Sequence, residues 1–174
     1  MKGRLRTSRG ASKNEDMYCG GAIFCDHATK LIDVRHQVTL GASDTVRSKK
    51  LFERMAFTHG VIVHSYHGDN GIFSSAEFKK HLEDTNQEIR YSGAGAHHQN
   101  GVAERAIKTV VSHARTMMLH ASLRWPDHED SSLWPLALSY AAYLWNITPK
   151  EQCAGVSPLE LFASTRFDKP LLER

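Results

Sequence analysis

Three carboxylates stand where the sequence changes from one predicted element to the next: Asp26, Asp69 and Glu104. Asp26 and Asp69 each follow a short apolar stretch, and Glu104 lies near the start of a long amphipathic one. Carboxylate oxygens are the ligands that Mg²⁺ prefers in proteins. Two such ions about 3.5–4 Å apart can stabilise both the attacking and the leaving oxygen of a phosphoryl displacement. The three acids are therefore candidate catalytic residues and candidate ligands for two metal ions.

Short stretches rich in apolar and β-branched residues predict the strands that would position the first two acids. We expect strands over residues 18–26, 31–40, 61–66 and 88–91, with one more near Gln37–Leu40 or within the second. Asp26 ends the first strand, and Asp69 follows the strand at 61–66. Strand ends in an α/β sheet converge on one edge, so we expect these two carboxylates to lie close together.

Helical periodicity accounts for most of the remaining chain. It predicts helices from Ser43 or Asp44 to Gly60, from Ser74 or Ser75 onward, and over 100–121, 133–145 and 159–162. The helix at 133–145 is apolar on nearly all sides, which predicts that it is well buried. The order of elements indicates an α/β fold, with a mixed central sheet of about five strands flanked by helices on both faces.

Glu104 lies at the rim of the apolar stripe on the predicted helix 100–121, roughly 80° from its centre at about 100° per residue. A loop of small and polar residues, 92–101, precedes this helix, and Lys108 follows Glu104 by one turn. That arrangement suits a metal site next to phosphates. An ordinary Glu–Lys surface pair, worth about 0.2–0.5 kcal/mol, explains the same spacing, and the helix alone favours that explanation.

Composition and charge limit the classes of protein to consider. The 174 residues fit one domain, and 41% hydrophobic with 24% charged residues is typical of a globular protein. No apolar run approaches the roughly 20 residues needed to cross a bilayer, so we expect no membrane partner. The net charge of +3 is compatible with a polyanionic partner but does not require one.

The basic residues near the N-terminus and the cysteines give two further expectations. Cations without an acid gather near the start, at Lys2, Arg4, Arg6, Arg9 and Lys13. They could lie on phosphates, although a solvated terminus is the simpler explanation. The chain has three cysteines and no CxxC pair, so we expect an intracellular setting, no disulfide framework and no structural zinc.

Two motifs around the acids carry a resemblance to a known family. HGDNGIFSSAEF at 67–78 and HHQNGVAERAIKTV at 97–110 resemble the integrase catalytic core of copia-type LTR retrotransposons. The family's QNGVAER motif is present letter for letter at Gln99–Arg105. A Trp-containing helix that ends in Asn-Ile-Thr-Pro, followed by GVSPLELF, resembles what comes next in the family. The likeness covers roughly residues 18–162.

The resemblance implies an RNase H-like fold and a metal-dependent polynucleotidyl transferase. The family's acid triad matches Asp26, Asp69 and Glu104, which would hold two Mg²⁺ or Mn²⁺ ions for 3′-end processing and strand transfer. DNA would be the partner, as element ends and as target, with a homo-oligomer as the working form and the nucleus as its location. The interval from Asp69 to Glu104 is one residue shorter than is usual in the family, and Ile72 stands where a glycine is common.

Residues next to Glu104 are candidate DNA contacts under this interpretation: Gln99, Asn100, Arg105 and Lys108. Ordinary solvation explains the two cations equally well, and Asn100 also suits a helix cap. Two other functions stay open. One is an integrase remnant that binds DNA or takes part in assembly without catalysis, and the other is an RNase H-like nuclease that only hydrolyses.

The sequence divides into three parts. A basic, flexible lead-in is expected at 1–16, the integrase catalytic core domain at 17–163, and a tail at 164–174. The tail is interpreted as the start of a downstream region, which would make the chain a piece of a longer polyprotein.

Overall fold

The computed structural model describes residues 2–4, 16–92, 101–128 and 130–164. Its central element is an antiparallel hairpin of β1 (Gly20–Cys25) and β2 (Ile32–Gln37). Cys25 pairs with Ile32 at the closed end of the hairpin, directly before Asp26. The prediction of a strand that ends at Asp26 is therefore confirmed to within one residue.

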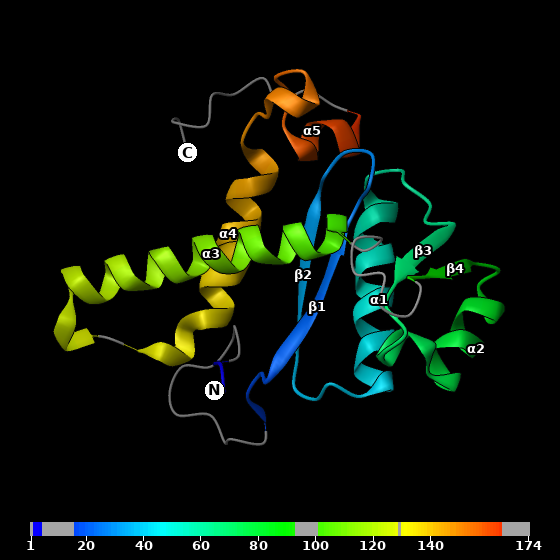
Figure 1. Cartoon of the computed structure of the whole chain (residues 1–174), viewed down its shortest axis with the longest axis horizontal. Coiled ribbons are helices and arrows are strands. Elements are labelled where there is room, and N and C mark those ends of the chain that lie inside the picture. Colours follow the sequence, from blue (N-terminus) through cyan, green and yellow to red (C-terminus); the bar gives the residue numbers. More distant parts are fainter. Residues whose placement is uncertain (1, 5–15, 93–100, 129, 165–174) are drawn as a thin grey trace.

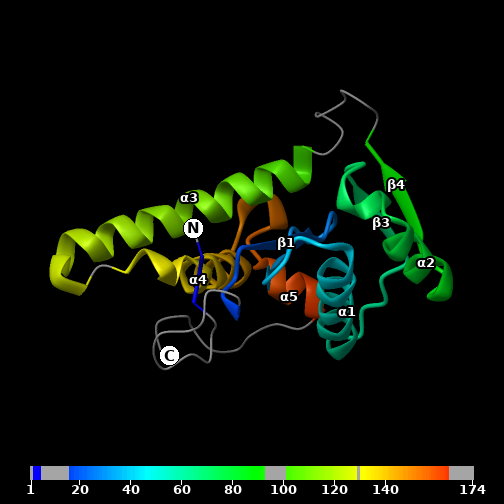
Figure 2. The same ribbon diagram turned by 90° about the horizontal axis from the view of Figure 1, so that it is seen from below.

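Alternation along the hairpin sends successive side chains to opposite faces. Phe24 is buried in a cluster with α1 (Ala42–Thr58). Its neighbour Ile23 packs on the other side, against a cluster formed by α3 (Gly101–Arg124) and α4 (Trp134–Ile147). Figures 1 and 2 show α1 on one side of the hairpin and the α3–α4 pair on the other. Helices thus flank both faces, as the sequence predicts.

A second sheet follows α1. β3 (Ser65–Gly68) and β4 (Glu88–Tyr91) form a parallel pair connected through α2 (Ala76–Asp84). Ser75 caps α2 because its hydroxyl accepts a hydrogen bond from the Phe78 amide at 3.3 Å. Phe78 is fully buried in a cluster that includes one side chain of α1, so this β3–α2–β4 unit packs on that helix.

The last described helix is α5 (Pro158–Ala163), which begins with a capping box. Ser157 Oγ accepts from the Glu160 amide, and the Glu160 carboxylate accepts from the Ser157 amide at 3.0 Å. Single-turn 3₁₀ helices complete the chain: η2 (Ile72–Ser74), η4 (Pro126–His128), η5 (Ser131–Leu133) and η6 (Glu151–Cys153). Within the described ranges, no helix has both the length and the apolar character to cross a membrane.

The described residues form two sheets of two strands each instead of one sheet of about five strands. β2 ends at Gln37 and no strand covers residues 38–40, because the chain bends at residues 38–39. Thr39 donates both its amide and its hydroxyl to the Asp44 carboxylate of α1, at 2.8 and 2.9 Å. A side chain therefore takes the backbone donor that a further strand would have used.

The strand predicted at 61–66 begins only at Ser65. The Val63 carbonyl accepts a hydrogen bond from the Gln87 side chain at 2.7 Å instead of joining a ladder. The two sheets still lie side by side, because the rings of Phe24 in β1 and Tyr66 in β3 meet edge to face with centroids 6.3 Å apart. Side-chain packing replaces backbone pairing at the junction between them.

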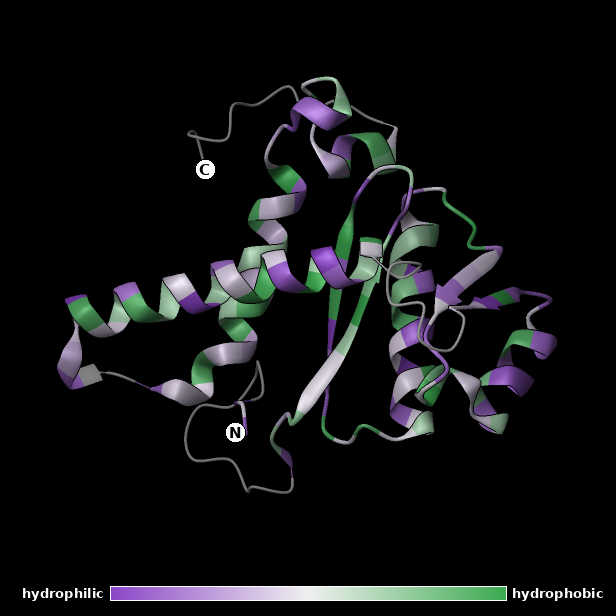
Figure 3. Ribbon diagram, viewed as in Figure 1, coloured by the Kyte–Doolittle hydropathy of each residue, from purple (hydrophilic) through white to green (hydrophobic). Residues whose placement is uncertain are grey.

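The expectation that the helix at 133–145 is buried on nearly all sides is wrong. Ala141 and Ala142 of α4 are in the core, whereas Leu136, Tyr140 and Tyr143 are each more than 40% exposed. Figure 3 shows hydrophobic residues on the turns of α3 and α4 that extend away from the hairpin. In the described part of the chain, nothing covers this side of the two helices.

Candidate active site

Asp26 occupies the turn that closes the β1–β2 hairpin. One carboxylate oxygen, Oδ2, accepts hydrogen bonds from the amide and the hydroxyl of Thr29, both at 2.7 Å. The Asp26 backbone is tied to the same turn, since its amide donates to the Leu31 carbonyl at 2.9 Å and its carbonyl accepts from Lys30 at 3.0 Å. Among the described residues, the other carboxylate oxygen, Oδ1, accepts no hydrogen bond, and Asp26 is half-buried.

Asp69 follows β3 directly and is exposed. Its Oδ1 accepts from the Gly71 amide at 3.1 Å, the bond of an Asx turn. The next residue, Asn70, donates to the Ser92 carbonyl at 3.3 Å, and His67 Nε2 lies 3.1 Å from Ser92 Oγ. The turn after β3 is thus fastened to the end of β4, while the Asp69 carboxylate extends into solvent.

Glu104 lies in the first turn of α3 and is exposed, as are Arg105 and Lys108. The start of this helix lies next to the Asp26 turn. A cavity of about 50 Å³ is lined by residues from both, among them Arg105 of α3 and Lys30 of the turn. Gln99 and Asn100, the other two candidate DNA contacts, lie outside the described residues.

Two cations that the sequence did not single out lie beside this cavity. Lys30 lines it, and its ammonium donates to the His27 carbonyl at 2.5 Å. Lys150 lies over the ring of Trp145, another lining residue, with its Nζ 3.9 Å from the ring centroid. Burial lowers the pKa of Lys150. Lys30 belongs to the Asp26 turn itself, whereas Lys150 comes from a distant segment of the chain that only the fold brings to the lining residue Trp145.

The other acids near the predicted strands have structural partners. Asp33 in β2 forms an ion pair with Arg35 at 2.5 Å, and burial raises its pKa in spite of that pair. Asp44 accepts the two bonds from Thr39 at the start of α1. Burial also raises the pKa of the Cys25 thiol, which suits a packed strand residue and not a nucleophile.

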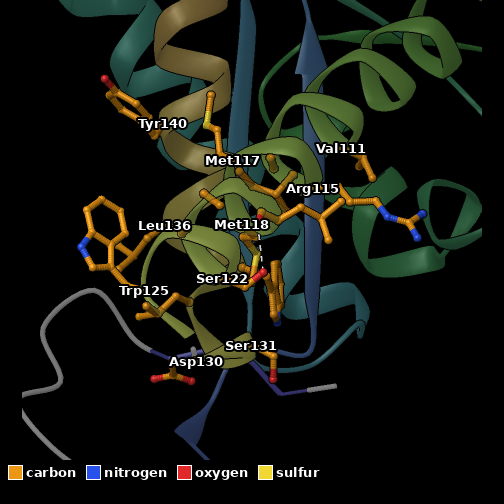
Figure 4. A pocket seen from close by; sticks show the side chains of 17 residues that line it. Val111, Arg115, Met117, Met118, Ser122, Trp125, Asp130, Ser131, Leu136 and Tyr140 are labelled. Carbon is orange, nitrogen blue, oxygen red and sulfur yellow. Dashed lines mark hydrogen bonds between the residues drawn. The ribbon is translucent and has the colours of Figure 1, made fainter. Parts of the chain in front are cut away.

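A larger groove lies away from the acids, between the C-terminal half of α3 and the first half of α4 (Figure 4). Its volume is about 990 Å³. The walls are mainly apolar and include Met117, Met118, Trp125 and Leu136. A lining of this kind offers little to a phosphodiester or a metal ion, so this groove is not the candidate active site.

The sequence matches no protein-family model and no curated protein. Solved structures do match its fold. The HTLV-2 integrase catalytic core domain in complex with magnesium aligns with a TM-score of 0.59 at 14% identity, over 87% of this chain and 88% of that chain. The BIV integrase catalytic core aligns with a TM-score of 0.57 at 15% identity, over 82% and 84% of the two chains. The chain has an integrase-core fold.

A further similar structure is the simian T-cell lymphotropic virus intasome in complex with the PP2A regulatory subunit B56 gamma. It aligns with a TM-score of 0.61 at 15% identity, over 86% of this chain and 48% of that one. At such identities the likeness establishes the integrase-core, RNase H-like fold alone. The α/β class and the RNase H-like fold expected from the sequence are thereby confirmed, although the described sheets are smaller than expected.

On this integrase-core fold, the three candidate acids follow β1, follow β3 and open α3. Their hard oxygen donors are the right chemistry for Mg²⁺ or Mn²⁺. Within residues 2–4, 16–92, 101–128 and 130–164, however, no three metal-ligating side chains lie together around one point. For one ion to contact all of Asp26, Asp69 and Glu104, the carboxylates must come closer than they lie here.

Proposed function

We propose that this chain is a metal-dependent polynucleotidyl transferase, the integrase catalytic core of a copia-type retroelement. One observation carries the proposal. The acids chosen from the sequence, Asp26, Asp69 and Glu104, fall at the ends of β1 and β3 and at the start of α3 in an integrase-core fold. The letter-for-letter motif at Gln99–Arg105, which leads into that third position, supports the same family.

In the proposed reaction, water or a DNA 3′-hydroxyl attacks a phosphodiester, and the displaced oxygen leaves as a 3′-hydroxyl. Asp26, Asp69 and Glu104 would hold two Mg²⁺ or Mn²⁺ ions, which would supply stabilisation of the attacking and leaving oxygens. Arg105 and Lys108, both exposed on the first turns of α3, contact the phosphates on either side of the scissile bond. The chain's own side chains thus bind and orient the strand.

The proposed partners are the element's DNA ends and target DNA. The structural relatives include an HTLV-2 core described as dimeric, one described as trimeric and a viral intasome. By analogy, we propose that the present chain forms a homo-oligomer and acts in the nucleus. The exposed apolar side chains of α3 and α4 are candidate contacts between copies.

A disintegration assay tests the proposal. The substrate is a branched DNA that mimics the strand-transfer product, incubated with the protein and Mn²⁺. Glu104→Gln removes one proposed ligand, and Glu77→Gln is the matched control, since Glu77 is also an exposed acid in the first turn of a helix. We expect wild type and Glu77→Gln to resolve the branch, and Glu104→Gln to lose at least about 100-fold in rate. Activity that survives Glu104→Gln means that the third ligand is misplaced.

A second candidate function is a non-catalytic DNA-binding or assembly domain. The observation that favours it is that no three metal-ligating side chains of the described residues lie together. Mn²⁺ binding separates the two functions, because only a metal site loses affinity in Asp69→Asn. Joined DNA products would further distinguish a strand transferase from an RNase H-like nuclease, which leaves nicks alone.

A further inference from the structure

The Asp26 turn is held by hydrogen bonds of its own, and it also contains one strained residue. It spans the residues between β1 and β2, and Lys30 within it has a positive φ of 64°, a conformation that costs free energy for a residue with a side chain. The turn's own hydrogen bonds join Asp26 to Thr29, Lys30 and Leu31. A short turn with a strained residue needs contacts from elsewhere to keep one geometry.

Those contacts come from the last turn of α4. The Asn146 amide binds the backbone of Ile32 at both of its polar groups, since Nδ2 donates to the carbonyl at 2.7 Å and Oδ1 accepts from the amide at 2.9 Å. Ile32 is 1% exposed and lies directly opposite Cys25, the residue before Asp26. The side-chain amide therefore takes the place of a neighbouring strand at this edge of β2.

Two further bonds reach the turn from the same direction. Trp145 Nε1 donates to the Lys30 carbonyl at 2.9 Å, which fixes the residue with the positive φ. Cys153 Sγ, just after α4, lies 3.7 Å from the Thr29 carbonyl. Thr29 in turn gives both of its donors to the Asp26 carboxylate. A chain of hydrogen bonds thus runs from the end of α4, through residues 29–32, to the candidate catalytic acid.

We propose that Asn146 and Trp145 are positioning residues for the Asp26 carboxylate. The proposal rests on the function proposed above, because only that function gives the Asp26 carboxylate a metal ion to hold. The geometry is specific to these side chains. An amide offers one donor and one acceptor at the spacing of a peptide group, whereas an aspartate would set a negative oxygen against the Ile32 carbonyl. Residues that orient a metal ligand typically change metal affinity or activity about 10–100-fold when they are replaced.

The experiment compares two changes on the same helix. Asn146→Asp keeps the shape and the acceptor but removes the donor to Ile32. Ser139→Ala is the matched control, because it removes the contact of Ser139 Oγ with His36 Nε2 at 2.9 Å, which also joins α4 to β2 but away from Asp26. Trp145→Phe is a second variant that keeps an aromatic ring but removes the Nε1 donor together with part of the indole. Three measurements are made on each protein. Hydrogen exchange gives the protection of the backbone amides, electron paramagnetic resonance monitors Mn²⁺ binding, and the disintegration assay gives the rate at varied Mn²⁺ concentrations.

We expect Asn146→Asp to accelerate amide exchange across residues 26–32 and to raise the half-saturating Mn²⁺ concentration about tenfold. Trp145→Phe should shift both in the same direction by less, and Ser139→Ala should leave both as in wild type. A similar effect of Ser139→Ala would overturn the proposal, since the end of α4 would then act only through general stability. Unchanged exchange at 26–32 in Asn146→Asp would overturn it as well.

The hydrogen-exchange measurement keeps this inference separate from the proposed function. The Thr29 amide is bonded to Asp26, so its exchange reports the placement of the carboxylate without any metal or DNA. If wild type neither binds Mn²⁺ nor resolves the branched DNA, the proposed function fails. Faster exchange at Thr29 in Asn146→Asp would then still establish the positioning, and unaltered exchange would refute it.

Discussion

The two aspartates of the candidate site are held in contrasting ways. Asp26 is half-buried, receives two hydrogen bonds at one oxygen and lies in a turn fastened by α4. Asp69 is exposed, and its carboxylate has one bond, to the Gly71 amide. The hairpin of Asp26 packs between helices on two faces, whereas the β3–α2–β4 unit of Asp69 packs on α1.

This contrast separates a preformed half of the site from a half that is attached to it. The attachment is made by a buried polar network at the base of the β3–α2–β4 unit. Lys49 of α1, with no exposed surface, binds Glu53 at 2.8 Å and Gln87 at 2.5 Å. Tyr66 of β3 donates to Glu53 at 2.8 Å. The position of Asp69 relative to Asp26 therefore depends on a few polar contacts as well as on packing.

Of the substitutions considered, replacement of Lys49 should have the largest effect on the difference between the two halves of the site. Lys49→Met keeps the length of the side chain but leaves Glu53 and Gln87 without their cation. Removing one partner of a buried ion pair costs roughly 3 kcal/mol, which we expect as the loss in free energy of unfolding by urea. The matched control is Lys50→Met, an exposed lysine one residue along α1, which should change stability by less than about 0.5 kcal/mol.

Hydrogen exchange shows where the loss falls. In Lys49→Met, amides of β3 and β4 should lose protection before those of β1 and β2 do. Equal loss of amide protection in both sheets would contradict the separation into two halves. If Lys49→Met is as stable as wild type, the polar network does not hold the β3–α2–β4 unit on α1.

A smaller effect is expected at the preformed half. Thr29→Val removes one of the two bonds to Asp26 Oδ2 and keeps the backbone donor. The free energy of unfolding should fall by about 1.5 kcal/mol, the scale of a hydrogen bond to a charged group. Thr58→Val is the control, because it removes a hydroxyl bond of 2.6 Å to a carbonyl at the end of α1. If the two variants bind Mn²⁺ equally, Thr29 does not orient Asp26.

The sequence predicted the positions of the acids better than it predicted the sheet. The sequence pattern located β1 and β4 closely, and α2 is capped by Ser75, one of the two serines at which the sequence predicts its start. The missing strand after β2 was not predictable from propensity, because Thr39 gives its donors to Asp44, five residues away and outside the expected strand. Competition between a side chain and a ladder is decided by tertiary geometry.

The supports of the candidate site were also invisible in the sequence. Asn146 lies 114 residues from Ile32 along the chain, and Lys49 lies 38 residues from Gln87. Nothing in the local pattern links either pair. The resemblance drew attention to Asn146 as part of an Asn-Ile-Thr-Pro ending, but only the fold shows what its amide binds. Residue type and spacing can nominate ligands, while the residues that position them depend on long-range contacts.

The smallest predicted effect is a dependence of stability on pH, which arises from one histidine in each half of the site. Burial lowers the pKa of His36 in β2 and of His81 in α2, where Lys49 adds to the effect. Between its lowered folded pKa and the unfolded value of 6.5, each folded histidine binds fewer protons than the unfolded chain. Stability therefore falls as pH drops below 6.5, and it is fully present above that value.

Two glutamine substitutions test how much each half of the molecule contributes to this loss of stability at low pH. His36→Gln should flatten the dependence of unfolding free energy on pH between about 7 and 5 and preserve β1–β2 protection at the lower pH. His81→Gln should flatten it too, but by protecting α2 and β4. His36 also contacts Trp134 and Ser139 of α4, so its effect should be the larger of the two. If either substitution protects both sheets equally, the halves unfold together, and Asp26 and Asp69 belong to one cooperative unit.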